Sequence, residues 1–412
     1  MVTATNTGLS EAAEVKAPHG VGLAQLILGI GGLFMGTGEF AAMGLLPDFA
    51  RSVHVSIPDA GHLISAYALG VVIGSPLVAI ATARMDRRRL LILLGLMIFV
   101  GNIATAFAPT FGTLSIARFL AGLPHGAYYG TASIMAAAMV PQRQRAQAIG
   151  RVMLGLALAN VIGVPLTTFI GQHFGWRAAF AGIGAGGALL ALLIPFTVPS
   201  LAAHKDASPT RELSAFRNVQ VWLTLATAAV GFAGMFAVYT YITPTLIQVS
   251  GIALGRVPLF LGLLGLGMVV GNIIGGWLTD KAQSLTIAGV QLWNLAFFCL
   301  FAVAAYSVIG VAIVLFFIGI GFAAVPALQA RLMDVAPHAQ SLAAAMNHSA
   351  FNLSNALGAW AGGLAIAYGW GFASTGYVAA AFAVVGLAFF LTALLTEHRG
   401  RHQTQGQRLK GV

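Results

Sequence analysis

Twelve apolar runs divide this sequence, and each is long enough to cross a lipid bilayer, which takes about 20 apolar residues. Lipid has to be their main solvent, because 8% of the residues are charged, against roughly 25% in soluble domains. The runs are continuous rather than alternating, so they predict α-helices instead of a β-barrel. We therefore expect an all-α, polytopic membrane protein. The predicted spans are 21–46, 60–82, 90–108, 111–138, 147–170, 177–198, 219–247, 257–279, 284–304, 307–331, 342–367 and 371–396.

The basic residues predict which way these spans run. With the N-terminus in the cytoplasm, 17 of the 21 Lys and Arg residues fall on the inner side, and Arg51, Arg177 and Arg256 fall outside. The remaining one, Arg118, lies within a span. This asymmetry follows the positive-inside rule, and an error of one span would destroy it. The formal charge of +10 therefore indicates membrane orientation rather than a nucleic-acid partner, and both termini are expected in the cytoplasm.

Three recurring stretches indicate that the chain is a duplication of six-helix halves. Residues 69–74 match 266–271, residues 158–163 match 353–358, and residues 38–40 match 234–236, at offsets of 197, 195 and 196. Such parallel repeats are typical of transporters that move two bundles about a central site. The predicted layout is a cytoplasmic tail at 1–20, a bundle at 21–198, a cytoplasmic linker at 199–218, a second bundle at 219–396 and a cytoplasmic tail at 397–412.

Two embedded charges are the first candidates for function, because an ionisable side chain inside a membrane is costly and functional by default. Glu39 is the embedded acid, and Arg118 is the embedded base at a matching depth. Burial disfavours the charged form of a carboxyl group and a nearby Arg favours it, so such a pair could respond to a proton gradient. Met235 and Leu315 stand at the repeat-related positions, so the fold does not require either charge. The alternatives are a structural, permanently neutral Glu39 and an Arg118 that clamps main-chain carbonyls.

Other polar residues in the spans are candidates for contact with a solute. His125 follows Arg118 on the same helical face and is either a proton relay, a substrate contact or a packed neutral residue. The residues His348, Asn352 and Asn355 form one polar stripe that lines a solute path or bonds to neighbouring helices. Tyrosines add aromatic surface with a hydroxyl, unless they belong to interfacial belts. The tyrosines concerned are Tyr67, Tyr128, Tyr239 and Tyr241.

The residue types and motifs of the sequence also argue against other classes of protein. The single cysteine, Cys299, excludes a disulfide framework and a cysteine-rich metal site. No Walker motif is present, so ATP-driven transport is not supported. A membrane-embedded enzyme would need clustered acid–base groups or metal ligands, and one embedded carboxylate with scattered histidines does not supply them. The short loops are too small to contain a signalling domain. We expect no cofactor, no metal and no catalytic residues.

The whole chain resembles the major facilitator superfamily, within it the twelve-helix drug:proton antiporters of the arabinose and sugar-efflux permease branch. Chloramphenicol-efflux and purine-efflux proteins are related to that branch. The stretches that carry the resemblance lie at 38–47, 63–70, 238–244 and 350–363. The resemblance implies two six-helix bundles, transport of a small molecule and a monomer in a bacterial inner membrane.

Three superfamily motifs can be placed on the sequence. The gating motif after the second span keeps Arg88 and Arg89 but has Arg84 in place of its aspartate. Its second copy is better preserved and contains Asp280 and Lys281. The motif of the fourth span, linked by the resemblance to proton coupling, matches Arg118, Gly122 and Gly126, and the antiporter motif of the fifth span matches Gly155, Gly163, Pro165 and Gly171.

These features together predict a secondary transporter that exports a small organic solute in exchange for protons by alternating access. Glu39 and Arg118 would carry the coupling, and the substrate would lie midway between the halves. A sugar, a nucleoside or purine, or a drug such as chloramphenicol fits the mixed polarity of the candidate residues. The alternative is an uncoupled facilitator or importer with the same fold. Val164 separates a Gly-Pro pair that is contiguous in the antiporter motif, which weakens the case for antiport.

Overall fold

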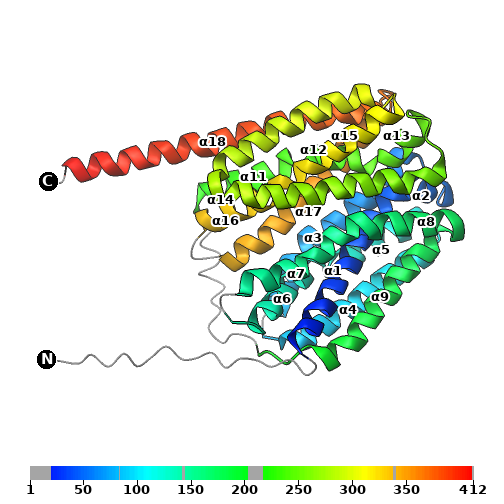
Figure 1. Ribbon diagram of the computed structural model, residues 1–412. Coiled ribbons are helices and arrows are strands. Elements are labelled where there is room, and N and C mark those ends of the chain that lie inside the picture. Colours follow the sequence, from blue (N-terminus) through cyan, green and yellow to red (C-terminus); the bar gives the residue numbers. More distant parts are fainter. Residues whose placement is uncertain (1–19, 83, 142–143, 203–216, 337–339, 411–412) are drawn as a thin grey trace.

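The computed structural model describes residues 20–82, 84–141, 144–202, 217–336 and 340–410, and within these ranges the elements are helices (Figure 1). The first half of the chain forms α1 (Val21–Gly44), α2 (Leu46–Ser52), α3 (Ile57–Ala81), α4 (Arg87–Phe107), α5 (Phe111–Gly122), α6 (His125–Ala138), α7 (Arg145–Leu158), a π-helical turn (Ala159–Gly163), α8 (Val164–Phe174) and α9 (Trp176–Thr197). The predicted tail at 1–20 and linker at 199–218 lie largely outside the described residues.

The second half repeats this pattern. It forms α11 (Val219–Gly231), α12 (Ala233–Thr240), α13 (Ile242–Gln248), α14 (Val257–Ala304), α15 (Val308–Ile320), α16 (Ala324–Val335), α17 (Gln340–Ala367) and α18 (Thr375–Lys410). Short 3-10 turns lie at Leu254–Arg256, Gly321–Ala323 and Phe372–Ser374. The two halves lie side by side in Figure 1.

The helices account for the twelve predicted spans. Nine stretches of the described chain are long and apolar enough to cross a membrane, and one of them, Leu254–Ala304, contains two predicted spans. The spans 111–138 and 342–367 are absent from that set. The first is broken into α5 and α6, each too short alone, and α17 carries the amide and imidazole side chains that lower its hydropathy. Counting the long stretch as two and adding these segments gives twelve.

One predicted span boundary falls at a kink in the structure, and one helix extends beyond its predicted span. α14 (Val257–Ala304) consists of two helices joined across a kink at Ala282, whose φ of −158° and ψ of 69° are non-helical, so the break expected between the spans 257–279 and 284–304 falls at this residue. The predicted tail at 397–412 is helical as far as Lys410, because α18 continues past the expected end at residue 396 and projects beyond the bundle (Figure 1). Hydropathy marks where apolar sequence ends, whereas a helix can continue into water when its residues favour it.

The fifth span shows how the antiporter motif shapes a helix. Pro165 has no N–H group to donate to the carbonyl four residues earlier, and the π-helical turn Ala159–Gly163 lies just before it. The N–H group of Val164 bonds to the carbonyl of Ala159, five residues back. A Cβ atom on Gly155 would collide with the main chain of Gly29, so this glycine lets α7 pack directly against α1. The motif residues therefore coincide with close packing at Gly155 and with a π-helical turn before Pro165.

The halves contact one another at the end of the molecule that carries α2 and α13, which we call the α2–α13 end (Figure 1). Thr243 of α13 donates to the carbonyl oxygens of Met43 and Gly44 at the end of α1, at 3.1 Å each. These carbonyls belong to the last turn of α1, which has no intrahelical donors left. Ser65 of α3 donates to the carbonyl of Ala356 in α17 at 3.2 Å. One half therefore completes the hydrogen bonding of the other at this end.

Candidate functional site

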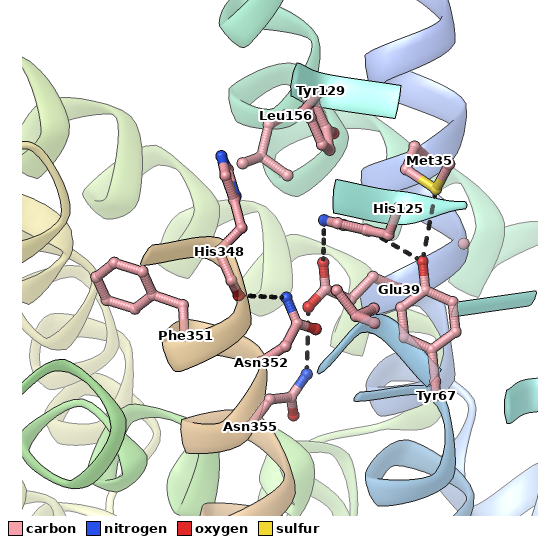
Figure 2. A network of polar contacts seen from close by, with 12 residues as sticks. Met35, Glu39, Tyr67, His125, Tyr129, Leu156, His348, Phe351, Asn352 and Asn355 are labelled. Atoms are coloured by element: carbon pink, nitrogen blue, oxygen red, sulfur yellow. Dashed lines mark hydrogen bonds and ion pairs between the residues drawn. The ribbon is translucent and has the colours of Figure 1, made fainter. Parts of the chain in front are cut away.

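Glu39 lies in the last third of α1, between the two halves, and is 4% exposed. Its two carboxylate oxygens contact different partners. Oε2 lies 3.6 Å from Nε2 of His125 in α6, and Oε1 accepts a hydrogen bond of 3.3 Å from the side-chain amide of Asn355 in α17 (Figure 2). His125 belongs to the first half and Asn355 to the second. A buried charge requires pairing or hydrogen bonding, and here both halves supply it.

Arg118, in α5, is fully buried and holds the main chain of α1 rather than the carboxylate. Its guanidinium donates to the carbonyl oxygen of Gly38 at 2.8 Å and to that of Glu39 at 3.3 Å. The guanidinium carbon also lies 4.4 Å from the centre of the Tyr67 ring, a cation–π distance. The expected contact between the first and fourth spans therefore exists, but it is the carbonyl clamp. The Arg118 charge acts on Glu39 without a direct bond to the carboxylate.

His125 is held by Tyr67 as well as by Glu39. The Tyr67 hydroxyl lies 3.1 Å from Nδ1 of His125, and the two rings meet edge to face (Figure 2). The Tyr67 hydroxyl also donates to the sulfur of Met35, at 3.7 Å, and the other ring nitrogen of His125, Nε2, faces the Glu39 carboxylate. Pro124, in the break between α5 and α6, precedes His125 directly and places it at the start of the new helix. A Cβ atom on Gly122 would collide with the main chain of Tyr67, so this glycine lets α5 approach α3.

The predicted polar stripe of α17 divides into three different environments. Asn355 contacts Glu39, whereas the amide of Asn352 donates to the carbonyl of His348 within its own helix at 3.1 Å. The His348 ring stacks on Tyr129 of α6, with centres 5.8 Å apart and planes 7° from parallel. The side-chain carbonyl oxygens of Asn352 and Asn355 are buried and accept no hydrogen bond from the described residues. Both asparagines lie beside Glu39, so these acceptors are free within the cluster (Figure 2).

Several tyrosines of the predicted set use their hydroxyls to join helices. Tyr128 donates to the carbonyl of Leu28, at 2.7 Å, inside the first half. Tyr241 donates to the carbonyl of Ala359, also at 2.7 Å, inside the second half. Tyr239 differs from both, because its hydroxyl crosses between the halves to Oδ1 of Asn160, at 3.4 Å. Tyr128 and Tyr241 therefore lie outside the cluster around Glu39.

Asn160 was absent from the predicted site, although the repeat contained the signal for it. It lies in the π-helical turn, at the position in 158–163 that corresponds to Asn355 in 353–358. Both asparagines reach from one half to the other. Phe40 and Phe236, likewise repeat-related, stack across the same boundary with centres 6.3 Å apart and planes 10° from parallel. The centre of the molecule therefore has an approximate symmetry that Glu39 breaks.

The gating-motif residues lie at the end opposite to α2 and α13. Arg88 and Arg89 begin α4, whose N-cap is Asp86: this carboxylate accepts from the N–H group of Arg89 at 3.1 Å and from the Ser200 hydroxyl at 2.6 Å. Partial burial opposes ionisation, yet these hydrogen bonds lower the pKa of Asp86. Lys281 lies over the ring of Trp277, at 3.6 Å, beside the exposed Asp280 in α14. In the described chain these contacts stay within one half.

The comparison with known proteins identifies the family. The sequence matches the model of the Major Facilitator Superfamily over residues 28–341. It is 40% identical to the inner membrane transport protein YdhP of Escherichia coli K12 over 89% of this chain and 94% of that protein. It is 31% identical to the putative transporter AraJ of the same strain, over 92% and 95% of the two chains. A probable sugar efflux transporter of Mannheimia succiniciproducens is 30% identical, over 90% and 94%.

The fold agrees with that match. The crystal structure of a D-xylose–proton symporter superimposes with a TM-score of 0.73 over 89% of this chain and 96% of that one, at 16% identity. A bacterial homologue of the human lysosomal transporter Spinster superimposes with a TM-score of 0.72 over 90% and 96%, at 18% identity. Twelve membrane-spanning helices in two bundles, three superfamily motifs and relatives that cover nearly the full length lead to one conclusion. The chain belongs to the major facilitator superfamily of membrane transporters.

Proposed function

We propose that this transporter exports a small organic solute in exchange for protons. The observation that carries the proposal is the Glu39 carboxylate, 4% exposed and contacted by His125 from one half and Asn355 from the other. Adding a proton to this group changes contacts in both bundles at once. A proton can therefore alter which arrangement of the bundles is favoured, which is the requirement for coupling. The similarity to a probable sugar efflux transporter supports export.

The proposed cycle uses the two bundles, 21–198 and 219–396, as the moving parts. The solute enters from the cytoplasm while the α2–α13 end is closed and Glu39 is ionised. The halves then open at the α2–α13 end, the solute leaves, and Glu39 takes a proton from outside. Return of the protonated protein and release of that proton to the cytoplasm complete the exchange. Arg118 holds the main chain of Glu39 in place throughout, because its donors bind the carbonyls of Gly38 and Glu39.

The orientation in this proposal rests on the distribution of basic residues. Arg84, Arg87, Arg88 and Arg89 lie at the end opposite to α2 and α13, and clusters of this kind face the cytoplasm. The α2–α13 end is then periplasmic. The name of the Escherichia coli relative, an inner membrane transport protein, supports the same membrane for this chain. Protein, lipid bilayer, protons and a small-molecule substrate suffice for the cycle, with the protein as a monomer.

The proposed substrate site adjoins Glu39 on the side of α17. Tyr129 and His348 form one stacked pair there, and Asn352 and Asn355 offer unused carbonyl acceptors. Flat aromatic faces and free acceptors suit an uncharged molecule that carries N–H or O–H donors. A sugar, a nucleoside or purine, or chloramphenicol meets that description. A strongly cationic drug fits less well, because both oxygens of Glu39 already have partners.

A two-step experiment tests the proposal. The protein is expressed in a host that lacks its own efflux pumps, and resistance is screened across antibiotics, purines and sugars, with Glu39→Gln as the control. The substrate found is then assayed in inverted membrane vesicles with an imposed proton gradient. Antiport predicts accumulation that collapses when an ionophore removes the gradient.

An uncoupled facilitator is the second candidate, and the interrupted Gly-Pro pair at Gly163 and Pro165 favours it. It predicts that the substrate equilibrates across the vesicle membrane and that the ionophore changes nothing. Equilibration that is insensitive to the gradient would therefore replace antiport by facilitation, and a gradient that drives the solute the opposite way would replace it by symport.

A further inference from the structure

Asn355 and Asn160 occupy repeat-related positions and each bonds to a residue of the other half, Glu39 and Tyr239 respectively, but the two bonds differ in strength. Asn355 donates to a carboxylate, at 3.3 Å, whereas Tyr239 donates to the Asn160 carbonyl, at 3.4 Å. Hydrogen bonds to ionised groups are roughly twice as strong as those between neutral groups. One of these two contacts between the halves therefore depends on a charge, and the other does not.

The contact depends on the charge of Glu39 because of how its donors are arranged. In an ionised carboxylate both oxygens are acceptors, and here one is bonded to Asn355 and the other lies 3.6 Å from Nε2 of His125, whereas a neutral carboxylic acid has one oxygen that has become a donor. Protonation therefore weakens the bond from the Asn355 amide or forces the amide to turn its free Oδ1 towards the new O–H group. Other titratable or charged groups near Glu39 belong to α3, α5, α6, α12 and α17. They are Tyr67, Arg118, His125, Tyr129, Tyr239 and His348.

We propose that Asn355 is the positioning residue that makes the exchange obligatory: its bond to ionised Glu39 holds the empty, proton-free transporter closed at the α2–α13 end. Without that bond the empty protein would open and close freely and dissipate the gradient. Substrate that occupies the Asn355 side chain, or a proton on Glu39, releases the contact and permits the movement. This inference rests on the proposed proton exchange, and it assigns to Asn355 a role separate from substrate binding.

The geometry supports this assignment in two further respects. Asn355 is fully buried, so its bond to Glu39 does not compete with bulk water. The contact also belongs to the same boundary as the other bonds that close this end, from Thr243 to the end of α1 and from Ser65 to Ala356. Asn352, in the same helix, bonds within α17 and adds nothing across the boundary. Opening the α2–α13 end requires breaking the Asn355 bond but not the Asn352 bond.

The test measures opening directly and needs no substrate. Cys299 is replaced by Ser, and spin labels are attached to cysteines introduced at Arg51 in α2 and Gln248 in α13. These exposed positions line one hollow of about 750 Å³ between the halves at the α2–α13 end, so their separation reports its opening. Distance distributions are recorded by pulsed electron spin resonance in lipid nanodiscs between about pH 5 and pH 9, a range chosen to span the titration of a buried carboxyl group.

The wild-type protein is expected to be closed at high pH and to gain an open population as the pH falls and Glu39 takes up its proton. Asn355→Leu should raise the ratio of open to closed protein at high pH by about tenfold or more, the loss of a charge-assisted bond, and should remove most of the pH dependence. Asn160→Leu and Asn352→Leu are the matched controls and should keep the wild-type pH dependence. The histidines near Glu39 remain in every variant, so their titration is common to all.

A charge exchange separates this role from simple packing. In the double variant Glu39→Gln with Asn355→Asp, the amide and the carboxylate change places, and the closed state at high pH should return. An Asn355→Leu protein that stays closed and pH-dependent overturns the proposal, as does a double variant that stays open. If the Glu39→Gln protein exports substrate against its gradient as well as the wild type does, the proposed function itself is overturned. Tightly coupled transport by Asn355→Leu beside an inactive Glu39→Gln would overturn only the inference.

Discussion

The two halves of this transporter place an asparagine at the same repeat position, and they use it for different purposes. In the second half Asn355 binds the carboxylate of Glu39, and in the first half Asn160 binds the phenol of Tyr239. The repeat-related position of Glu39 is Met235, and that of Arg118 is Leu315. A duplicated scaffold thus carries an ionisable centre on one side of its pseudo-symmetry axis. The comparison teaches that the fold does not require this charge, because the other half forms without it, and this supports the proposed role of Glu39 in coupling.

The largest effect is expected from placing a carboxylate at Met235, because the second half has no arginine at the position that corresponds to Arg118. Met235 is fully buried in α12, and Leu315 of α15 stands at the position that corresponds to Arg118. Met235→Glu should lower the free energy of unfolding by about 2.5 kcal/mol or more, the cost of an unpaired charge within the membrane. Thermal unfolding of the purified protein in detergent measures it. Met235→Gln is the control for polarity alone and should be milder. Equal stability of Met235→Glu and wild type would show that Arg118 and its neighbours are not what makes Glu39 tolerable.

The next largest effect is expected from replacing Arg118 by leucine, the residue at the corresponding position 315 of the second half. Arg118→Leu leaves the buried carboxylate of Glu39 without a nearby cation and removes the clamp on two main-chain oxygens. Loss of one partner of a buried charge costs about 3 kcal/mol, but Arg118 does not bond the carboxylate itself, so we expect about 2 kcal/mol, and transport should be lost. The double variant Arg118→Leu with Glu39→Met should recover most of the stability but none of the coupling. A double variant as unstable as the single one would mean that Arg118 supports the helix ends alone.

A smaller effect is expected at the contact between α13 and α1. Thr243→Val removes the hydroxyl that binds the carbonyls of Met43 and Gly44 and keeps the shape of the side chain. Its loss should weaken closure of the α2–α13 end by about 1 kcal/mol, seen as faster labelling of a cysteine at Pro47 by a membrane-impermeant reagent. Because Thr243 carries no charge, the effect should be the same at every pH. A strongly pH-dependent effect would contradict the view that Glu39 is the titrating contact.

The smallest effect is expected at the bond between Tyr239 and Asn160, in which both groups are neutral. Tyr239→Phe removes a hydrogen bond of 3.4 Å between neutral groups and leaves the stacking of its ring on Phe40 intact. Stability should change by about 0.5 kcal/mol, and the number of protons exchanged per solute should not change. Reconstituted vesicles with a pH-sensitive dye measure this ratio. A changed ratio would place the coupling in both halves and would remove the contrast between them.

The sequence predicts the fold well, because hydropathy and the placement of basic residues act on whole segments. The twelve spans followed from residue types and spacing. The form of the connection between the spans 257–279 and 284–304 did not, because a polar segment such as 280–283 is equally compatible with a loop and with the kink found at Ala282. The helical extension of α18 was missed for the related reason that hydropathy is silent outside the membrane.

The sequence predicts which residues gather around Glu39 but not which atoms of these residues contact one another. Glu39, Arg118, His125, Tyr67 and Asn355 do converge, since buried polar side chains in a membrane have few other partners. Which atom of Arg118 meets which atom of α1 depends on rotamers and on helix rotation, and a sequence does not specify these. The repeat does point to Asn160, because aligning 158–163 with 353–358 pairs Asn160 with Asn355. Tyr128 and Tyr241 were included because a tyrosine that anchors a helix and one that meets a solute look the same in a sequence.

Gradient-driven transport by Glu39→Gln is the most direct test of the claim that one carboxylate couples this protein to protons. The glutamine side chain would keep the size of the glutamate and a neutral hydrogen bond with Asn355, so the protein should fold and bind its substrate. In vesicles with an imposed proton gradient the wild type should concentrate the substrate, and Glu39→Gln should only let it equilibrate. Concentration of the substrate by Glu39→Gln to the wild-type level would contradict the account.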